Sequence, residues 1–278
     1  MGNLLINQKD KLLYPTIFGF FLLSGYILIK PITRMIAQSV EKNFDELKKK
    51  HRPKRIVLIR HGFSEGNENM EIYGKVPNHK IKLTQKGVQQ AIEAGEKLKE
   101  IIKMEEIKFI ISPFTRTRQT FREISSSLEG KQFVIEEDSL LKEQESGNFM
   151  KIEKLQQTLK ERDEVSTFFY RFEGGESASD VYDRATLFLT ILFRQFDRMS
   201  INNKKRFENV GLVTHGLFIK CFLMRLFNWT LEEFEKRQIP DNCQIIVLEK
   251  DSNGKYHFDS NCLKIKENGE NDLVRENK

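Results

Sequence analysis

Residues 55–67 read RIVLIRHGFSEGN, and this stretch begins with a short apolar run at residues 56–59. A continuous apolar run without alternation is typical of a strand that is buried on both faces of a sheet. The Arg60-His61-Gly62 that follows places polar side chains where the strand ends. The stretch therefore predicts a central strand with a functional loop at its carboxyl end.

The same arrangement recurs along the chain. Apolar runs predict further buried strands, and amphipathic stretches between them predict helices. The strands are expected at residues 109–111, 133–135 and 210–213, with a closing hairpin at 243–248 and 256–258. The helices are expected from Thr84, at 115–128, at 150–162, from Ser177 with its Ser-x-x-Asp capping sequence, and from Leu217. Alternating strands and helices predict a three-layer α/β/α domain with a mostly parallel central sheet.

Polar side chains follow several of these strands. Arg60 and His61 close the first strand, Arg116 and Glu143 come after the second and third, and His215 follows the run at 210–213. Ligands of such sheets bind at the carboxyl ends of the strands. Two histidines and two arginines gathered there would form a cationic pocket, and a phosphoryl group suits such a pocket.

Four motifs carry a family resemblance. They are RHGFSEGN at 60–67, SPFTRTRQT at 112–120, Glu143 with Gly147, and THG at 214–216. Together, and in this order, they resemble the histidine phosphatase superfamily, which has the phosphoglycerate-mutase-like fold. The resemblance covers residues 55–250. The segments at 143–149 and 175–184 look like those of the plant and fungal phosphoglycerate-mutase-like phosphatases.

The resemblance implies a two-step phosphoryl transfer. Neutral His61 would attack phosphorus and form a phosphohistidine intermediate. Arg60, Arg116 and His215 would hold the phosphoryl oxygens, and Glu143 would protonate the leaving group and then activate water. Glu145 stands two residues from Glu143 and is the alternative acid.

The resemblance also implies a set of substrate-binding residues. They are Arg60, Ser64, Asn67, Arg116, His215 and Gly216. Arg118 is expected to form a salt bridge on its helix instead. The sequence holds no recognisable set of metal ligands, so we expect neither a metal nor another cofactor.

A hydrolase is favoured over a mutase. Mutases that resemble this family carry a longer, more basic insertion after the acid, whereas the segment after Glu143 is short and its lysines are scattered. The expected substrate is a phosphorylated small molecule or a phosphopeptide. The alternatives are a phosphoglycerate-type mutase and a membrane-tethered module that binds phosphorylated ligands and is catalytically weak.

The net charge of +6 lies in one part of the chain. Residues 1–55 hold 11 basic and 4 acidic side chains, a balance of +7, and the remaining 35 basic and 36 acidic side chains balance to −1. Since the body of the chain is nearly neutral, no nucleic-acid partner is expected.

The basic N-terminal part contains an apolar run, LLYPTIFGFFLLSGYILI at residues 12–29. Eighteen helical residues span about 27 Å, the lower limit for crossing a bilayer. We expect a membrane anchor at 12–30; the alternatives are a cleaved signal peptide, a buried core helix or an interfacial segment. The lysines and arginines that follow the run place the phosphatase domain in the cytosol. The resulting division is a flank at 1–11, the anchor, a basic linker at 31–54, the phosphatase domain at 55–263 and a polar tail at 264–278.

Overall fold

The structure, a computed structural model, describes residues 30–43, 46, 49, 52–149, 151–201 and 207–266 of the 278-residue chain. The chain divides into two compact units, residues 1–50 and 51–278. The second contains the central sheet and all four motifs.

The first unit is described only from residue 30 onward. Of the predicted anchor at 12–30, only Lys30 lies among the described residues. Residues 30–43 form a helix whose apolar side chains are exposed. No helix in the described ranges is both long enough and apolar enough to cross a bilayer. The anchor therefore stays a prediction.

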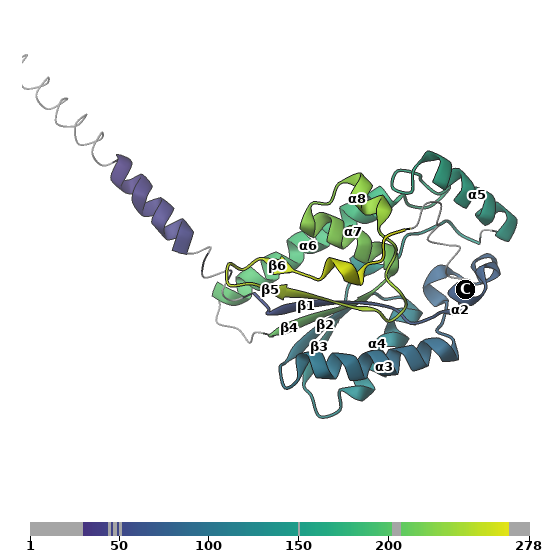
Figure 1. The fold of residues 1–278 in the computed structure, drawn as a ribbon, viewed down its shortest axis with the longest axis horizontal. Helices are drawn as coiled ribbons and strands as arrows, with labels where there is room; N and C mark the ends of the chain where they lie inside the picture. Colours follow the sequence, from purple (N-terminus) through teal and green to yellow (C-terminus); the bar gives the residue numbers. More distant parts are fainter. Residues whose placement is uncertain are drawn as a thin grey trace, which may run out of the picture. The chain divides into compact units, whose positions relative to one another are not determined.

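The second unit is built on a mixed sheet of six strands (Figure 1). The strands are β1 (Arg55–Arg60), β2 (Ile107–Ile111), β3 (Phe133–Glu137), β4 (Asn209–Thr214), β5 (Ile245–Lys250) and β6 (Tyr256–His257). Their order across the sheet is β3-β2-β4-β1-β5-β6. The first four are mutually parallel, and the β5–β6 hairpin joins antiparallel to β1. The prediction of a mostly parallel sheet with a closing hairpin is confirmed.

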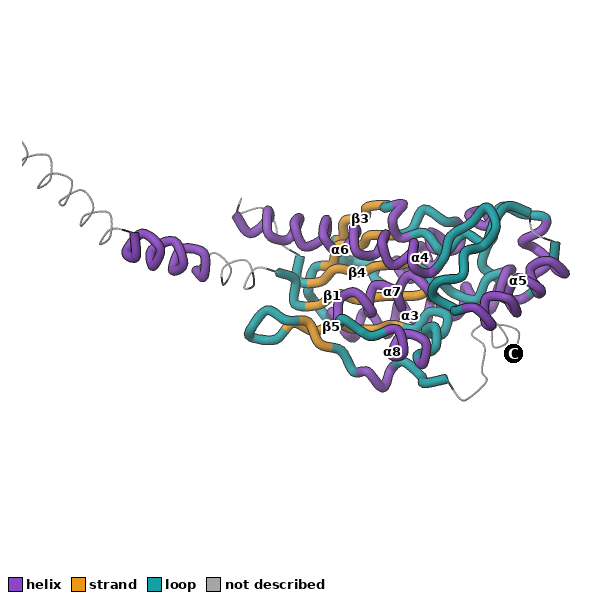
Figure 2. The backbone as a smooth tube through the Cα atoms, turned by 90° about the horizontal axis from the view of Figure 1, so that it is seen from above, coloured by secondary structure: helices purple, strands orange, loops and turns teal. Residues whose placement is uncertain are grey.

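Helices cover both faces of this sheet (Figures 1 and 2). The helices are α2 (Glu65–Glu68), α3 (Gln85–Ile102), α4 (Thr115–Ser127), α5 (Ile152–Val165), α6 (Ala178–Ile201), α7 (Gly216–Phe227) and α8 (Leu231–Lys236). Short 3-10 turns lie at η1 (Met70–Gly74), η2 (Asn78–Lys80), η3 (Ser139–Leu141) and η4 (Ser260–Cys262). Helices α3 and α4 pack on one face, and α6 and α7 on the other.

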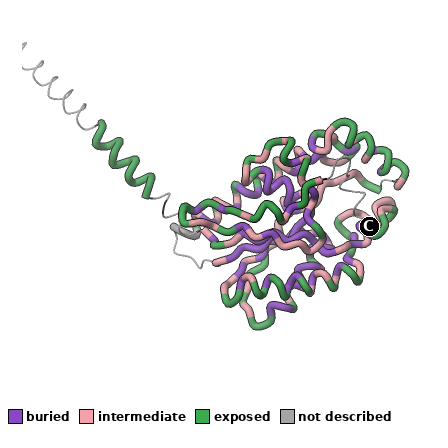
Figure 3. Tube along the Cα trace, in the orientation of Figure 1, coloured by how far each residue is buried: buried purple, intermediate pink, exposed green. Residues whose placement is uncertain are grey.

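Strand β1 shows why the sheet is buried on both sides. Ile56 and Leu58 belong to the core beneath α6 and α7, whereas Val57 and Ile59 belong to the core beneath α3 and α4. Successive side chains of a strand point to opposite faces, so a run of four apolar residues fills both cores. Figure 3 shows the central strands as the most buried part of the chain.

The third strand differs from its prediction. Residues 133–135 were expected to form a buried strand, but β3 is the edge of the sheet, and Val134 and Ile135 are about half exposed, at 47% and 48%. An edge strand has one neighbour only, and β3 pairs with β2 alone. An apolar run of three residues carries no information about position in the sheet.

Two glycines let the loop after β1 pack against the start of α3. A Cβ on Gly62 would lie 2.4 Å from the carbonyl oxygen of Gly87, and a Cβ on Gly87 would lie 2.1 Å from that of Phe63. Both neighbours are backbone atoms, which cannot rotate away. This close approach fixes the loop that carries His61.

We predict that Gly87→Ala lowers the free energy of unfolding by about 1–3 kcal/mol, because the added methyl group pushes α3 away from the loop. Urea unfolding measures the change. Gln85→Ala is the control, since Gln85 is exposed two residues earlier on the same helix. Equal stability of the two variants would contradict the proposed close packing.

Candidate active site

The polar motifs meet at the carboxyl ends of β1, β2 and β4. Because β4 lies between the other two strands, Arg60 pairs with Thr214 and Ile111 pairs with Val213. The residues that follow these strands are therefore neighbours, and the rings of His61 and His215 lie 5.2 Å apart between centroids. The structure thus brings together two histidines that are 154 positions apart in the sequence.

His61 has both ring nitrogens engaged. Nδ1 lies 2.8 Å from the carbonyl oxygen of Gly62, and Nε2 accepts a hydrogen bond from Arg116 Nε at 3.2 Å. A carbonyl oxygen can only accept, so the hydrogen is assigned to Nδ1 and the lone pair to Nε2. Burial, followed by the charges of Arg116 and Arg60, holds the pKa of His61 well below its ordinary value. The imidazole is therefore neutral near pH 7.

His215 is also buried and neutral. Its Nε2 lies 2.8 Å from Ser112 Oγ, and its Nδ1 is buried without a hydrogen-bond partner in the part of the chain that the structure describes. Burial is the main reason why the pKa of His215 is far below its ordinary value, and the charge of Arg116 adds to it. If Ser112 donates to Nε2, Nδ1 carries the hydrogen and can donate it to a ligand.

The two arginines of the site are held from different directions. Arg116 Nη1 donates to the backbone oxygen of Asn78 at 2.8 Å and to its Oδ1 at 3.0 Å. Arg60 Nη1 donates to the Pro240 carbonyl oxygen at 2.8 Å. Both side chains are almost fully buried. Arg118, as expected, lies apart from them in an exposed ion pair with Glu137.

The remaining predicted binding residues have different surroundings. Ser64 caps helix α2 with Asn67: its hydroxyl donates to Asn67 Oδ1 at 3.0 Å and accepts from the Asn67 amide at 3.3 Å. Asn67 also lines the pocket. Gly216 is the first residue of α7, and a Cβ there would lie 2.1 Å from Ile239. Ser64 and Gly216 therefore have clear packing roles beside the pocket.

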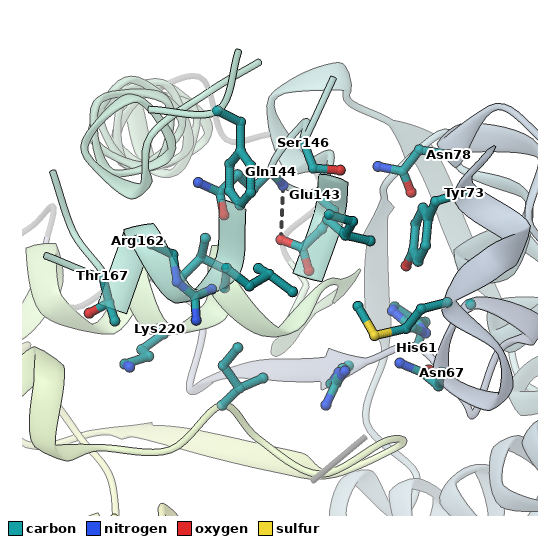
Figure 4. Close-up of a pocket in the computed structure, with 18 of the residues that line it drawn as sticks. His61, Asn67, Tyr73, Asn78, Glu143, Gln144, Ser146, Arg162, Thr167 and Lys220 are labelled. Atoms are coloured by element: carbon teal, nitrogen blue, oxygen red, sulfur yellow. Dashed lines mark hydrogen bonds between the residues drawn. The ribbon is translucent and has the colours of Figure 1, made fainter. Parts of the chain in front are cut away.

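Glu143 lines the same pocket as His61, Arg60 and Arg116 (Figure 4). Its Oε1 accepts a hydrogen bond from the Gln144 amide at 3.0 Å. Glu145, the alternative acid, has its carboxylate 3.4 Å from Asn78 Nδ2. Of the two carboxylates, only Glu143 is among the residues that line the pocket.

Arg184 is a site residue that the sequence did not single out by role. From α6 it donates to the carbonyl oxygens of Leu140 at 2.7 Å and Lys142 at 3.2 Å, and reaches that of Glu143 at 3.5 Å. Its guanidinium also forms two hydrogen bonds with the Glu176 carboxylate. Arg184 therefore holds the backbone of the segment that presents Glu143. Only the helical position of Arg184, seven residues after Ser177, was visible in the sequence.

The part of the chain that the structure describes holds no group of three or more His, Cys, Asp or Glu side chains placed to bind a metal ion.

Comparison with known proteins identifies the family of this chain. Residues 56–261 match the model of the histidine phosphatase superfamily, branch 1. The chain belongs to the histidine phosphatase superfamily. It is 42% identical over 213 residues to the phosphoglycerate mutase-like protein AT74 of Arabidopsis thaliana, covering 73% of this chain and 67% of that protein. It is 31% identical to the broad-range acid phosphatase DET1 of Saccharomyces cerevisiae, covering 72% of this chain and 86% of DET1.

Solved structures of two phosphatases share the fold. A mycobacterial glucosyl-3-phosphoglycerate phosphatase superposes with a TM-score of 0.57 at 18% identity, covering 77% of this chain and 98% of that chain. The alpha-ribazole phosphatase of Shigella flexneri superposes with a TM-score of 0.55 at 19% identity, covering 72% and 92%. The predicted fold class of the domain and its family are thereby confirmed, and a phosphatase or mutase-like activity follows from the family.

The two buried histidines predict a pH-dependent stability. The pKa of each is far below its ordinary value in the folded chain and returns to about 6.5 on unfolding. Below about pH 6.5 the unfolded chain therefore binds more protons, and the free energy of unfolding falls as the pH falls, by up to about 2.7 kcal/mol per pH unit for two groups. Urea unfolding from about pH 7.5 to about pH 5 measures this slope.

Single variants identify the groups responsible for the slope. His61→Ala and His215→Ala are each expected to remove about half of it. His257→Ala is the control because that ring is exposed and paired with Asp251. A flat profile in the unmodified chain, or a slope that neither variant changes, would contradict the neutral state of the buried pair.

Proposed function

We propose that the chain is a phosphomonoester hydrolase that acts through a phosphohistidine on His61. The observation that carries the proposal is the pair of contacts that assigns the tautomer of His61: Nδ1 lies against the Gly62 carbonyl oxygen, and Nε2 lies against the Arg116 Nε donor. A neutral imidazole with an unprotonated ring nitrogen is a competent nucleophile at neutral pH. The superfamily membership and the likeness to the yeast broad-range acid phosphatase support the same proposal.

In the first step His61 Nε2 attacks phosphorus. A nitrogen–phosphorus bond forms while the bond from phosphorus to the ester oxygen breaks, and the leaving oxygen takes a proton from Glu143. The phosphoryl group then resides on His61 and the alcohol departs. Glu143 is preferred to Glu145 as the acid because it lines the pocket, whereas Glu145 lies against Asn78.

In the second step a water molecule replaces the histidine. Glu143, now ionised, takes a proton from the water, whose oxygen bonds to phosphorus as the nitrogen–phosphorus bond breaks. Inorganic phosphate leaves and His61 returns to its neutral form with Nδ1 still donating to Gly62. Each step therefore needs one proton transfer at the same carboxyl group.

Positive charge and hydrogen-bond donors stabilise the transferred group. Arg60 and Arg116 are buried beside His61, where charges interact more strongly than in water. The buried Nδ1 of His215 lacks a partner among the described residues, and a phosphoryl oxygen would satisfy it. Ser112 fixes the ring of His215 through the opposite nitrogen.

One assay distinguishes the hydrolase from two other functions. A mutase would isomerise 3-phosphoglycerate without releasing phosphate, and a binding module would do neither. The hydrolase is favoured because the segment after Glu143 is short, His61 and Glu143 line one pocket, and the ring of His215 lies against that of His61. Exclusive isomerisation would overturn the hydrolase in favour of the mutase.

We predict that His61→Ala lowers kcat/KM for p-nitrophenyl phosphate by at least about a thousandfold, since the variant lacks the nitrogen that attacks phosphorus. Phosphate release measures the loss. The unmodified chain, stopped with alkali during turnover, should also carry a base-stable phosphoryl group that the variant lacks. His257→Ala serves as the matched control. Equal turnover by the unmodified chain and His61→Ala would favour the binding module.

We predict a second, selective effect for Arg184, which positions Glu143 without touching substrate. Arg184→Lys keeps the charge but cannot reach Glu176 and the carbonyl oxygens of the 140–143 segment together. Because a poor leaving group needs the acid and p-nitrophenolate does not, kcat should fall about tenfold or more for an alkyl phosphate and much less for p-nitrophenyl phosphate.

The control for this prediction is Arg171→Lys. Arg171 is exposed and pairs with Asp180, which lies on the same helix as Arg184. Glu143→Gln should show the same selectivity as Arg184→Lys in stronger form. An equal fall for both substrates in Arg184→Lys would mean that Arg184 supports the fold in general and not the acid.

We propose further that residues 12–30 anchor the chain in a membrane as a single span, with the phosphatase domain facing the cytosol. The apolar run and the excess of basic residues after it support this. Helix 30–43, with Ile32, Met35, Ile36 and Val40 exposed, would follow the span directly.

We predict that the full chain sediments with membranes and resists extraction with alkaline carbonate, whereas a chain that begins at Arg52 stays in the supernatant and keeps its phosphatase activity. The basis is the separate second unit, residues 51–278, which contains the whole site. Membrane association of the shortened chain would contradict the anchor, and extraction of the full chain by carbonate would favour peripheral attachment.

A further inference from the structure

The segment between α8 and β5, residues 237–244, lies along the loop that carries His61. The Pro240 carbonyl oxygen accepts a hydrogen bond from Arg60 Nη1 at 2.8 Å. The Cys243 amide donates to the carbonyl oxygens of Arg60 at 3.1 Å and His61 at 3.3 Å. Cys243 has a φ of 55°, in the left-handed region that residues with a side chain rarely adopt. This segment has no part in the two-step reaction, yet it follows the backbone of the nucleophile closely.

The side chain of Asn242, in the same segment, links two parts of the site. Its Nδ2 donates to the His61 carbonyl oxygen at 3.0 Å and to Asn67 Oδ1 at 3.2 Å. An amide NH2 group has two hydrogens, and each of them has one of these acceptors. Asn242 thus joins the backbone of the nucleophile to a side chain of α2 that lines the pocket.

The hydrogen bonds around Asn67 fix the orientation of its amide group. Oδ1 accepts from the Ser64 amide at 3.0 Å, from the Ser64 hydroxyl at 3.0 Å and from Asn242. A backbone N–H can only donate, so the atom beside it is the oxygen. Asn67 is 3% exposed and lines the pocket, and its NH2 group donates to none of the described residues. This NH2 group is therefore available to a ligand in the pocket.

Ser64 and Asn242 restrain this amide in different ways. Ser64 belongs to the same helical turn as Asn67, so its hydrogen bonds fix the amide relative to α2 only. Asn242 fixes the amide relative to His61, which lies outside that helix. A hydrogen bond weakens steeply when its geometry departs from the ideal, so a donor to the transferred group must keep its place relative to the attacking nitrogen.

Contacts with the C-terminal part of the domain hold the residues on either side of Asn242. Asp241 forms an ion pair with Lys264 at 2.5 Å. Gln244 Nε2 donates to the Cys262 carbonyl oxygen at 2.6 Å, and its Oε1 accepts from the Asp241 amide at 2.7 Å. Asn242 therefore extends toward the site from a restrained backbone.

We propose that Asn242 is a positioning residue, which keeps the NH2 group of Asn67 in place relative to His61 so that it donates to a phosphoryl oxygen during the transfer. This rests on the proposed hydrolase function and on the phosphoryl contact that the family resemblance implies for Asn67. Asn242 is not among the residues that line the pocket. Without Asn242 the His61 carbonyl oxygen would still have the Cys243 amide as a donor, whereas the amide of Asn67 would lose its link to the nucleophile.

A double-mutant cycle on the full chain tests the proposal. The four chains are the unmodified protein, Asn242→Ala, Asn67→Ala and the double variant, and the measured quantity is kcat/KM for p-nitrophenyl phosphate. We expect Asn242→Ala alone to lower kcat/KM about tenfold, since the amide of Asn67 is released. In the Asn67→Ala background the same substitution should lower it about twofold or less, because the group that Asn242 positions is already absent.

Two further variants complete the test. Asn253→Ala is the matched control, at an exposed asparagine between β5 and β6, and should keep the original kcat/KM. Asn242→Leu has nearly the volume of asparagine but no donor, so it should reproduce the loss and its dependence on Asn67 even if Asn242→Ala destabilises the fold. A residue that only supports the fold would cause the same loss in both backgrounds.

Equal losses in the two backgrounds, or full activity of both Asn242 variants, overturn the positioning role. Failure of the hydrolase is a different result, in which the unmodified chain releases no more phosphate than His61→Ala. Calorimetric titration with inorganic phosphate then decides. A loss of affinity in Asn242→Ala that disappears in the Asn67→Ala background supports the positioning role without turnover, and a loss of equal size in both backgrounds contradicts it.

Discussion

The hydrogen bond from Arg116 to His61 is the contact on which the rest of the site depends. A guanidinium group always donates, so it can face Nε2 only if that nitrogen is unprotonated. The Gly62 carbonyl completes the constraint by holding the hydrogen on Nδ1. A protonated His61 would place two buried cations against each other, and the fold therefore selects the neutral ring. The positive charge of Arg116, which would bind phosphate, thus also keeps His61 neutral and therefore nucleophilic.

This contact requires support from segments far apart in the chain. Asn78 fixes Arg116 with two oxygen atoms, and the glycines at 62 and 87 bring the His61 loop onto α3. On the opposite side, Thr214 Oγ1 donates to the Leu141 carbonyl oxygen at 2.7 Å, which ties the segment before Glu143 to the end of β4. The end of strand β4, and not only the surface loops, thereby holds the backbone around the site in place.

Much of the site could be predicted because its residues sit where strands end. Arg60, His61 and His215 each follow an apolar run directly, and in a parallel sheet such ends meet at one edge. Asn78 and Arg184 had no such signal. Asn78 belongs to a short turn without periodicity, and the role of Arg184 depends on which loop passes its helix, a property of tertiary packing.

Lys220, which is buried on α7, shows a related limit of sequence reasoning. A lysine within an apolar helix is usually a residue on a solvated face, and no local pattern distinguishes it from one that is buried. The strand at 133–135 was predicted, but its expected burial was wrong for a similar reason, because a run of three apolar residues fits an edge and a centre equally well. The local sequence pattern predicted the strands and helices and where they end. Which strands are adjacent in the sheet, and which side chains meet at the pocket, could be seen only in the folded structure.

The exposed edge strand has a consequence for how these molecules behave in concentrated solution. An unpaired strand edge can receive a strand from another molecule and so begin an aggregate. β3 has only five residues and ends in Glu136 and Glu137, which form ion pairs with Lys108 and Arg118. An incoming strand would have to cover these charges and displace their partners. Although Val134 and Ile135 are exposed, the edge is thus a poor template for the growth of β-sheet aggregates.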